Sequence, residues 1–124
     1  MAKILVIEDD ASLGKALVIK LQSLKYEVDR AGNGQEGLAL ALANHHDLIL
    51  LDLIMPILSG TDMLKALRQD EWGKSVPVII MTNLSGENRI AQATDLGANE
   101  YIVKADMDIN DIVKEVERYL NEPW

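Results

Sequence analysis

The sequence predicts an open α/β sheet in which a strand and a helix alternate five times along the chain. Several short runs of Ile, Leu and Val are continuous, which is typical of strands buried on both faces of a parallel sheet. The segments between them repeat apolar residues every three or four positions, which is typical of helices. At 124 residues the chain has the size of one domain. We therefore expect a single domain over residues 1–124, with no output domain in this chain.

Each of the five strands is predicted from a short apolar segment. The second segment alternates Tyr26 and Val28 with polar residues, which favours an edge position in the sheet. The other four are continuous apolar runs. In chain order the predicted strands are residues 3–7, 26–31, 48–51, 76–81 and 101–103.

Each predicted strand is followed by a segment with helical character. Asp10 is suited to cap the first helix, since a carboxylate accepts hydrogen bonds from free N–H groups at a helix start. The second helix, over residues 35–43, is rich in Ala and Leu, which are good helix formers. The remaining apolar stripes are Leu13, Leu17, Leu21 and Leu24; Met63, Leu64 and Leu67; the weaker Ile90, Ala93 and Leu96; and Ile112, Val113, Val116 and Leu120.

Polar side chains stand at the ends of four predicted strands. Glu8 and Asp9 follow the first strand, Asp52 the third, Thr82 the fourth and Lys104 the fifth. Ligands of open parallel sheets bind at the carboxyl ends of the strands, so we expect these side chains to converge. Three crowded carboxylates repel one another, and Mg²⁺ is a natural counter-charge because it prefers oxygen ligands. A nucleophilic carboxylate beside a cation, a hydroxyl and a lysine outlines a phosphoryl-transfer site.

The composition excludes several classes of function. The 20 acidic and 12 basic residues give a net charge of −8, which opposes direct binding to nucleic acid. The absence of Cys rules out disulfides and thiolate metal sites. There is neither a signal peptide nor an apolar run that could span a bilayer, so we expect no membrane association and a cytoplasmic location.

The polar strand ends, taken in order, resemble the receiver domain of bacterial two-component response regulators, as in the chemotaxis regulators. The resemblance rests on residues 4–10, on the stretch from Asp52 through Met55 and Pro56 to Gly60, and on the later Thr and Lys. It covers essentially the whole chain. It implies a flavodoxin-like doubly wound (βα)5 fold with a parallel five-stranded sheet in the order 2-1-3-4-5.

The same resemblance implies a phosphorylation switch. A histidine kinase or a phosphotransfer protein would donate a phosphoryl group to Asp52. Mg²⁺, or Mn²⁺, would be held by Glu8, Asp9, the Asp52 carboxylate and the backbone oxygen of Ile54. The domain would be no enzyme in the usual sense, since it would catalyse only its own phosphorylation and dephosphorylation.

Three further roles follow from the resemblance. Lys104 would pair with the phosphoacceptor or the phosphoryl oxygens, and Thr82 would bond a phosphoryl oxygen. Tyr101 occupies the aromatic switch position, which turns inward when the threonine is drawn to the phosphoryl group. A downstream protein would bind the face formed by about residues 86–120.

The chain departs from the family pattern at a few positions. Ala105 stands where the family usually has proline, often after a cis bond; without proline a cis bond costs about 3–4 kcal/mol, so we predict a trans bond. Asn83 follows Thr82 at a position where the family commonly has a small residue. Ile54 and Leu84 cannot hydrogen-bond an attacking water, which predicts slow hydrolysis of the phosphoryl group. The adjacent pair at positions 45–46, both His, is predicted to lie on the surface.

The sequence disfavours three alternative functions. A receiver fold used purely for docking typically lacks one of the acids, the Thr or the Lys, whereas this chain keeps them all. A phosphatase of the haloacid dehalogenase type requires a second Asp two residues after the nucleophile, where this chain has Ile54. Electron transfer on a flavodoxin-like sheet is disfavoured because no phosphate-cradling loop follows the first strand.

Overall fold

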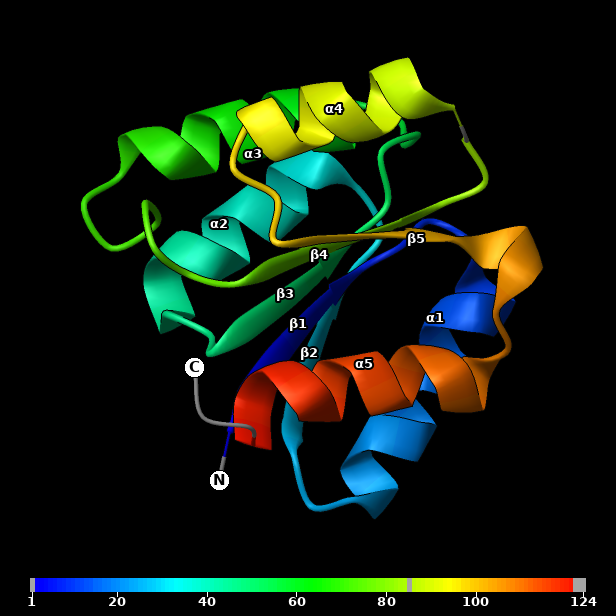
Figure 1. Cartoon of the computed structure of the whole chain (residues 1–124). Coiled ribbons are helices and arrows are strands. Elements are labelled where there is room, and N and C mark those ends of the chain that lie inside the picture. Colours follow the sequence, from blue (N-terminus) through cyan, green and yellow to red (C-terminus); the bar gives the residue numbers. More distant parts are fainter. Residues whose placement is uncertain (1, 85, 122–124) are drawn as a thin grey trace.

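The computed structural model describes residues 2–84 and 86–121, which form one parallel sheet flanked by helices (Figure 1). The strand order is β2-β1-β3-β4-β5, which confirms the predicted fold and the edge position of the second strand. The strands are β1 (Lys3–Ile7), β2 (Glu27–Ala31), β3 (Leu48–Leu51), β4 (Val78–Thr82) and β5 (Glu100–Val103). The helices are α1 (Ala11–Ser23), α2 (Gly34–Asn44), α3 (Gly60–Gln69), α4 (Glu87–Asp95) and α5 (Ile109–Asn121), with a short 3₁₀ helix, η1 (Lys104–Asp106).

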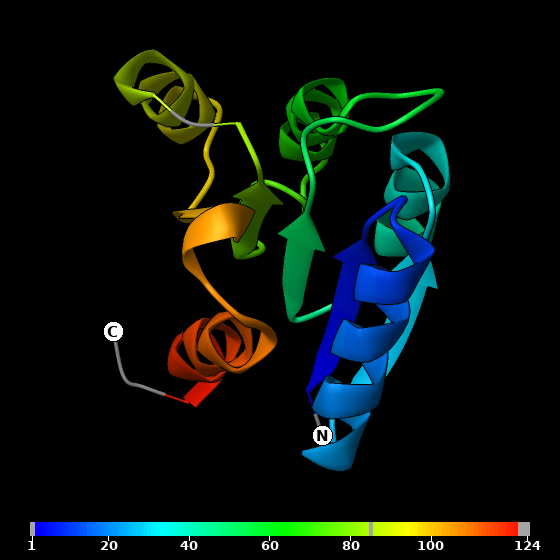
Figure 2. The same cartoon turned by 90° about the vertical axis from the view of Figure 1, so that its right-hand side faces the viewer.

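The helices cover both faces of the sheet. Figures 1 and 2 show α1 and α5 on one face and α2, α3 and α4 on the other. Side chains alternate between the two faces along each strand. In β1, Ile4 and Val6 join the core beneath α1 and α5, whereas Leu5 and Ile7 join the core beneath α2 and α3. Apart from Lys3 at the start of β1 and Thr82 at the end of β4, the central strands are therefore apolar, which explains the continuous runs in the sequence.

The strand register places the strand ends side by side. Ile7 of β1 pairs with Leu51 of β3, so the next residues, Glu8 and Asp52, leave the sheet together. The backbone N–H of Asp52 also donates to the carbonyl of Ile7, over 3.1 Å. Thr82 pairs with Val103 at the ends of β4 and β5. Parallel pairing thus gathers residues distant in sequence at one edge of the sheet.

Some predicted boundaries were wrong. The fourth strand begins at Val78 rather than residue 76, since Pro77 has no N–H to contribute to a strand ladder, and Thr82 is its last residue. Leu24 lies beyond the end of α1 and is 37% exposed, so it does not extend the buried stripe.

The prediction that both histidines lie on the surface is wrong for His46. His45 is exposed and stacks on Trp72, with ring centroids 4.4 Å apart. The side chain of His46 is buried, and its Nε2 lies 2.7 Å from Oδ2 of Asp29 on the edge strand. This carboxylate satisfies one ring nitrogen, which makes burial of the imidazole tolerable.

The helix α4 is held less firmly than the others. Ala93 is its one buried residue, and Gly86 at its N-cap offers no side-chain hydrogen bond. A cavity of about 80 Å³ lies between α4 and α3 and is lined in part by Leu64, Leu84 and Leu96. The weak periodicity of this segment in the sequence therefore corresponds to loose packing.

Candidate active site

Glu8 lies at the end of β1 and is fully buried. Its backbone is held by two consecutive residues of β2. The N–H donates to the carbonyl of Ala31 over 3.0 Å, and its carbonyl accepts from Nη2 of Arg30 over 2.9 Å. Asp9, the next residue, is exposed, and Asp10 caps α1 by accepting hydrogen bonds from the N–H groups of Ser12 and Leu13, as predicted.

Asp52 follows β3 at the opening of a tight turn. Its side chain is almost buried, and Oδ1 accepts from the N–H of Ile54 over 3.4 Å. The turn returns to α3 so closely that a Cβ on Gly60 would lie 2.1 Å from the backbone oxygen of Asp52. Within the turn, Ile57 adopts a φ of 71°, and the N–H of Leu58 donates to the carbonyl of Pro56. This closed loop fixes the direction of the Asp52 side chain.

Lys104 joins the two buried carboxylates. Its Nζ donates to Oε1 of Glu8 and, over 3.0 Å, to Oδ2 of Asp52. The lysine side chain is only 15% exposed, so the ion pairs are largely shielded from water. The bond between Lys104 and Ala105 is trans, as predicted, and leads into η1.

The three carboxylates form a suitable set of ligands for a divalent cation. Glu8, Asp9 and Asp52 each offer an oxygen atom, and these oxygens lie within 4.8 Å of one another. Hard oxygen donors at such spacing suit Mg²⁺, which is bound through few carboxylates and keeps several waters. Ile54 is 59% exposed. That its backbone oxygen is a fourth metal ligand stays a prediction.

Burial and charge strongly affect the ionisation of this cluster. Burial raises the pKa of Glu8 to about 7; Lys104 opposes this effect and Asp52 adds to it. Burial lowers the pKa of Lys104, but its hydrogen bonds and charge interactions with Glu8 and Asp52 outweigh this, so the net pKa is raised. At neutral pH the lysine is therefore charged, whereas Glu8 is close to its titration point.

Thr82 and Tyr101 both contact the backbone of Leu84. The hydroxyl oxygen of Thr82, which is buried, accepts from the N–H of Leu84 over 3.4 Å. The hydroxyl of the half-buried Tyr101 donates to the carbonyl of Leu84 over 2.8 Å. Burial also raises the pKa of Tyr101. One loop residue therefore connects the two side chains predicted to take part in switching.

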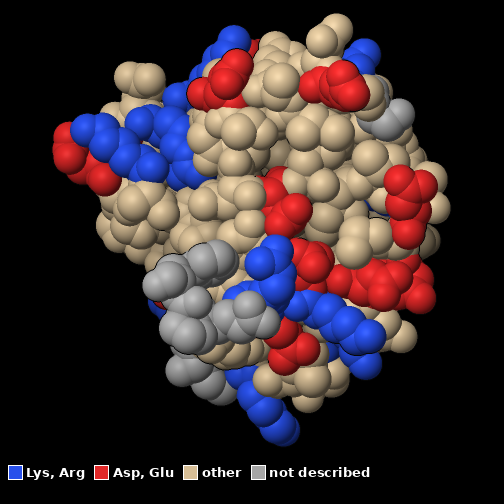
Figure 3. All heavy atoms as spheres, viewed as in Figure 1, with Lys and Arg blue, Asp and Glu red and all other residues tan. Residues whose placement is uncertain are grey.

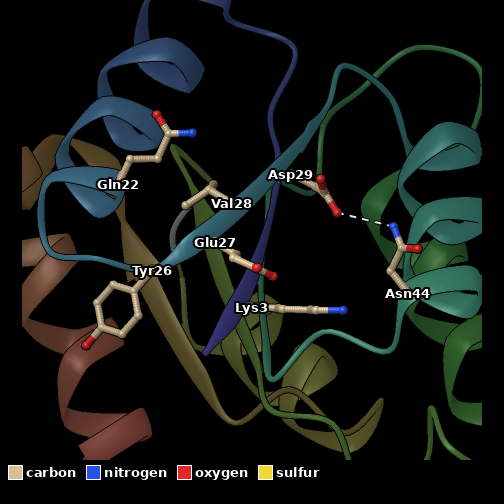
Figure 4. A pocket seen from close by; sticks show the side chains of 7 residues that line it. All are labelled: Lys3, Gln22, Tyr26, Glu27, Val28, Asp29 and Asn44. Carbon is tan, nitrogen blue, oxygen red and sulfur yellow. Dashed lines mark hydrogen bonds between the residues drawn. The ribbon is translucent and has the colours of Figure 1, made fainter. Parts of the chain in front are cut away.

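A second hollow, of about 530 Å³, lies along the edge strand β2 (Figure 4). It is lined by Lys3 at the start of β1, whereas Asp52 follows the end of β3, so the hollow lies at the opposite end of the sheet. Lys3, Glu27 and Asp29 face it together with Asn44, whose side-chain amide donates to Asp29 over 3.2 Å. Because charges of both signs line this open hollow, it favours no single class of ligand. The carboxylate cluster is the better candidate for chemistry.

One family model, that of the response regulator receiver domain, matches residues 4–117. The chain belongs to this family. Among curated relatives, response regulator ArlR of Staphylococcus aureus is 36% identical over 120 residues, which are 97% of this chain and 53% of ArlR. This receiver domain thus spans about half the length of the curated relatives it matches.

Solved structures of receiver domains have the same fold. Chemotaxis response regulator CheY4 of Vibrio cholerae is 29% identical, with a TM-score of 0.89 over 96% of this chain and 98% of the other. The non-phosphorylated HemR receiver domain of Leptospira biflexa is 30% identical, with a TM-score of 0.90 over 100% and 98%. The receiver domain of a sensor histidine kinase of Pseudomonas aeruginosa, whose structure has a magnesium ion in the active-site cleft, is 25% identical, with a TM-score of 0.86 over 98% of each chain.

The surface of this receiver domain reflects its acidic composition. In Figure 3 acidic side chains gather along the right-hand edge, where Figure 1 has the end of β5 and the start of α5. Basic side chains are scattered among acidic ones elsewhere on that face. In the part of the chain that the structure describes, no helix is long and apolar enough to cross a membrane.

Proposed function

We propose that this receiver domain is switched by phosphorylation of Asp52, with a histidine kinase or a phosphotransfer protein as the donor. The observation that carries the proposal is the shared lysine: Lys104 bonds both Asp52 and Glu8 at the carboxyl edge of the sheet, where three carboxylate oxygens lie within 4.8 Å. Such a cluster combines a nucleophile with the charges that phosphoryl transfer requires.

In the transfer, a carboxylate oxygen of Asp52 forms a bond to phosphorus while the bond between phosphorus and the donor's histidine nitrogen breaks. The bonding electron pair stays on the imidazole. Lys104 is placed to stabilise negative charge on the transferring oxygens. Mg²⁺, or Mn²⁺, held by Glu8, Asp9, Asp52 and the Ile54 backbone oxygen, would supply further positive charge when bound.

The phosphoryl group would then compete for the hydroxyl of Thr82. This hydroxyl now accepts a weak hydrogen bond from Leu84, at 3.4 Å, and would donate instead to a phosphoryl oxygen. Because Tyr101 is bonded to the same loop residue, movement of that loop changes the contacts of the tyrosine. A downstream protein would then bind the face of this domain that α4, β5 and α5 form, about residues 86–120, according to the position of the loop.

The lifetime of the phosphoryl group follows from the residues that flank it. Ile54 and Leu84 offer only apolar side chains, which cannot position an attacking water as a general base would. We therefore expect slow loss of the phosphoryl group. Replacement of both residues by Gln should speed its hydrolysis, as measured by the decay of phosphorylated protein; an unchanged rate would contradict this role.

The proposal is tested by intact-protein mass spectrometry after incubation with acetyl phosphate and Mg²⁺. We expect one added phosphoryl group, which is absent from the Asp52→Ala variant and from samples treated with a chelator. If the Asp52→Ala variant gains no phosphoryl group under conditions in which the wild-type protein does, Asp52 is the site of phosphorylation. If wild-type protein gains no phosphoryl group, even from a phosphorylated histidine kinase, the domain acts as a docking module instead.

A further inference from the structure

Arg30 contacts the acidic turn from the far side of β1. It lies on the edge strand β2 and is half-buried, and its Nη2 donates to the backbone oxygen of Glu8 over 2.9 Å. That oxygen belongs to the peptide bond between Glu8 and Asp9. A single guanidinium therefore holds the peptide plane that joins two of the three carboxylate residues.

The hydrogen bond replaces one that the sheet cannot provide. The ladder between β1 and β2 continues to the N–H of Glu8, which donates to the carbonyl of Ala31. A further step would bond the carbonyl of Glu8 to the N–H of residue 33. The chain has left the sheet by then, since Asn33 is the N-cap of α2. Arg30 thus satisfies the first acceptor beyond the ladder.

A glycine in α1 makes room for this arrangement. The helix packs across β1 and β2 (Figure 2), and a Cβ on Gly14 would lie 2.2 Å from Nε of Arg30. Glycine is unfavourable inside a helix, so the helix itself gains nothing from it. The guanidinium of Arg30 occupies the space that a side chain at position 14 would fill.

The arrangement also has a cost. Nε of Arg30 is buried without a hydrogen-bond partner among residues 2–84 and 86–121. A buried donor without a partner is unfavourable and calls for an explanation. A smaller apolar residue would avoid this penalty, but it would leave the carbonyl oxygen of Glu8 without its hydrogen bond. The unpartnered donor is therefore tolerated in exchange for a bond that holds the peptide between Glu8 and Asp9.

We propose that Arg30, seated on Gly14, is a positioning residue that orients the Glu8–Asp9 peptide so that both carboxylates meet Asp52 at the metal site. This inference rests on the proposed function. Outer partners that fix the geometry of metal ligands typically change metal affinity by about tenfold or more when removed. Arg68 provides the contrast: it bonds the carbonyls of Gly73, Val76 and Gly97, none of which belongs to the carboxylate cluster.

The test is a double-mutant cycle on Mg²⁺ binding, measured by calorimetry. Gly14→Ala displaces the guanidinium but keeps its charge, and we expect about tenfold weaker binding of Mg²⁺. Arg30→Met also removes a positive charge that disfavours a nearby cation, so its loss of affinity should be smaller. In the Arg30→Met background, Gly14→Ala should change the dissociation constant by less than about twofold, because the guanidinium is already gone.

A second readout requires no metal. Hydrogen exchange of the Glu8 amide in Mg²⁺-free protein should quicken in both single variants, relative to their global stability. Arg68→Met is the matched control: it removes a half-buried guanidinium that also holds backbone carbonyls, yet it should leave the Mg²⁺ dissociation constant and the Glu8 amide unaffected.

Two results would overturn the inference. If Gly14→Ala has the same effect with and without Arg30, the effect arises in α1 and not through the guanidinium. If Arg68→Met weakens Mg²⁺ binding as much as Gly14→Ala does, general destabilisation explains both. Wild-type protein that neither binds Mg²⁺ nor accepts a phosphoryl group would overturn the proposed function as well, whereas failure of the cycle alone leaves that function intact.

Discussion

At the scale of single residues, Lys104 compensates the negative charge of two buried carboxylates, those of Glu8 and Asp52. Glu8 and Asp52 both leave the sheet at the same edge, and the amino group of the lysine lies between them. A buried charge whose partner is removed is strongly destabilising. The lysine therefore contributes to stability in the absence of metal, in addition to the role proposed for it in phosphoryl transfer.

The first prediction concerns the Lys104→Met variant in Mg²⁺-free buffer. At pH 8 we expect a loss of about 2 kcal/mol in the free energy of unfolding, less than for a fully buried pair because Glu8 can take up a proton. At pH 5 the loss should be smaller, since Glu8, whose pKa is about 7, is already protonated. Urea unfolding at the two pH values measures the difference. The exposed Lys15, changed to Met, is the control, and equal losses at both pH values would contradict the prediction.

The second prediction concerns the pH dependence of Mg²⁺ binding. Because burial raises the pKa of Glu8 to about 7, a proton competes with the metal below that value. Affinity should be constant above it and fall by up to about tenfold for each pH unit below it. Calorimetry from about pH 5 to pH 8 tests this. Glu8→Gln should bind more weakly but without the same pH dependence, and a flat wild-type profile would refute the competition.

The raised pKa of Glu8 also determines whether the free energy of unfolding rises or falls with pH when no metal is bound. The folded state holds the Glu8 proton more tightly than the unfolded state, whose carboxyl has the ordinary value of 4.5. The free energy of unfolding should therefore fall as pH rises from about 4.5 to about 7, and this contribution should not change further above that window.

At the scale of elements, the loop between β3 and α3 stores strain beside Asp52, the proposed phosphoacceptor. Ile57 is β-branched, 75% exposed and held at a φ of 71°. Together with the hydrogen bond from Leu58 to Pro56, this describes a γ-turn of the rare, strained form. The side chain gains little from burial that would offset the strain.

The third prediction is that Ile57→Gly raises the free energy of unfolding by about 1 kcal/mol, since glycine adopts a positive φ without a steric penalty. Ile54 is the matched control: it is also an exposed isoleucine of this loop, but its φ is not positive, so Ile54→Gly should not stabilise. Thermal and urea unfolding compare the two. A stabilised Ile54→Gly, or a destabilised Ile57→Gly, would show that the loop is not strained at residue 57.

The fourth prediction concerns α4. With one buried residue, no side-chain cap and a cavity beneath it, α4 should open at a lower free energy than α1 or α5. Hydrogen exchange followed by mass spectrometry should show its amides exchanging first among the helices. Protection of α4 equal to that of α5 would contradict this. A segment of low local stability is well suited to respond to the movement proposed for the loop at Leu84.

At the scale of the whole molecule, much of the fold could be predicted because the two hydrophobic cores impose their pattern on the chain. Continuous apolar strands, helical stripes and polar strand ends are local features, and the order of the sheet followed from the resemblance. Glu8, Asp52 and Lys104 can be recognised in this way, since each directly follows a strand. The boundary at Pro77 and the exposure of Leu24 depend on hydrogen bonds and helix ends that apolar runs do not encode.

Other features could not be predicted because they join residues of different elements through side chains. An arginine on an edge strand is usually solvated, so nothing in the sequence near Arg30 indicates its bond to Glu8. Gly14 inside a helical stripe was the available signal, but its partner becomes apparent only when α1 lies on β2. The burial of His46 likewise depends on Asp29, a residue from another strand.

The strand order also has a consequence for synthesis on the ribosome. After the pair of β1 and β2 has formed, β3, β4 and β5 join successively at one growing edge of the sheet, and a nascent chain emerges with its N-terminal part first. The acids of β1 and β3 can meet early, but Lys104 follows the last strand to be translated. A partly translated chain would therefore hold its carboxylates together without the lysine, and the proposed phosphorylation would require that the fifth strand has docked.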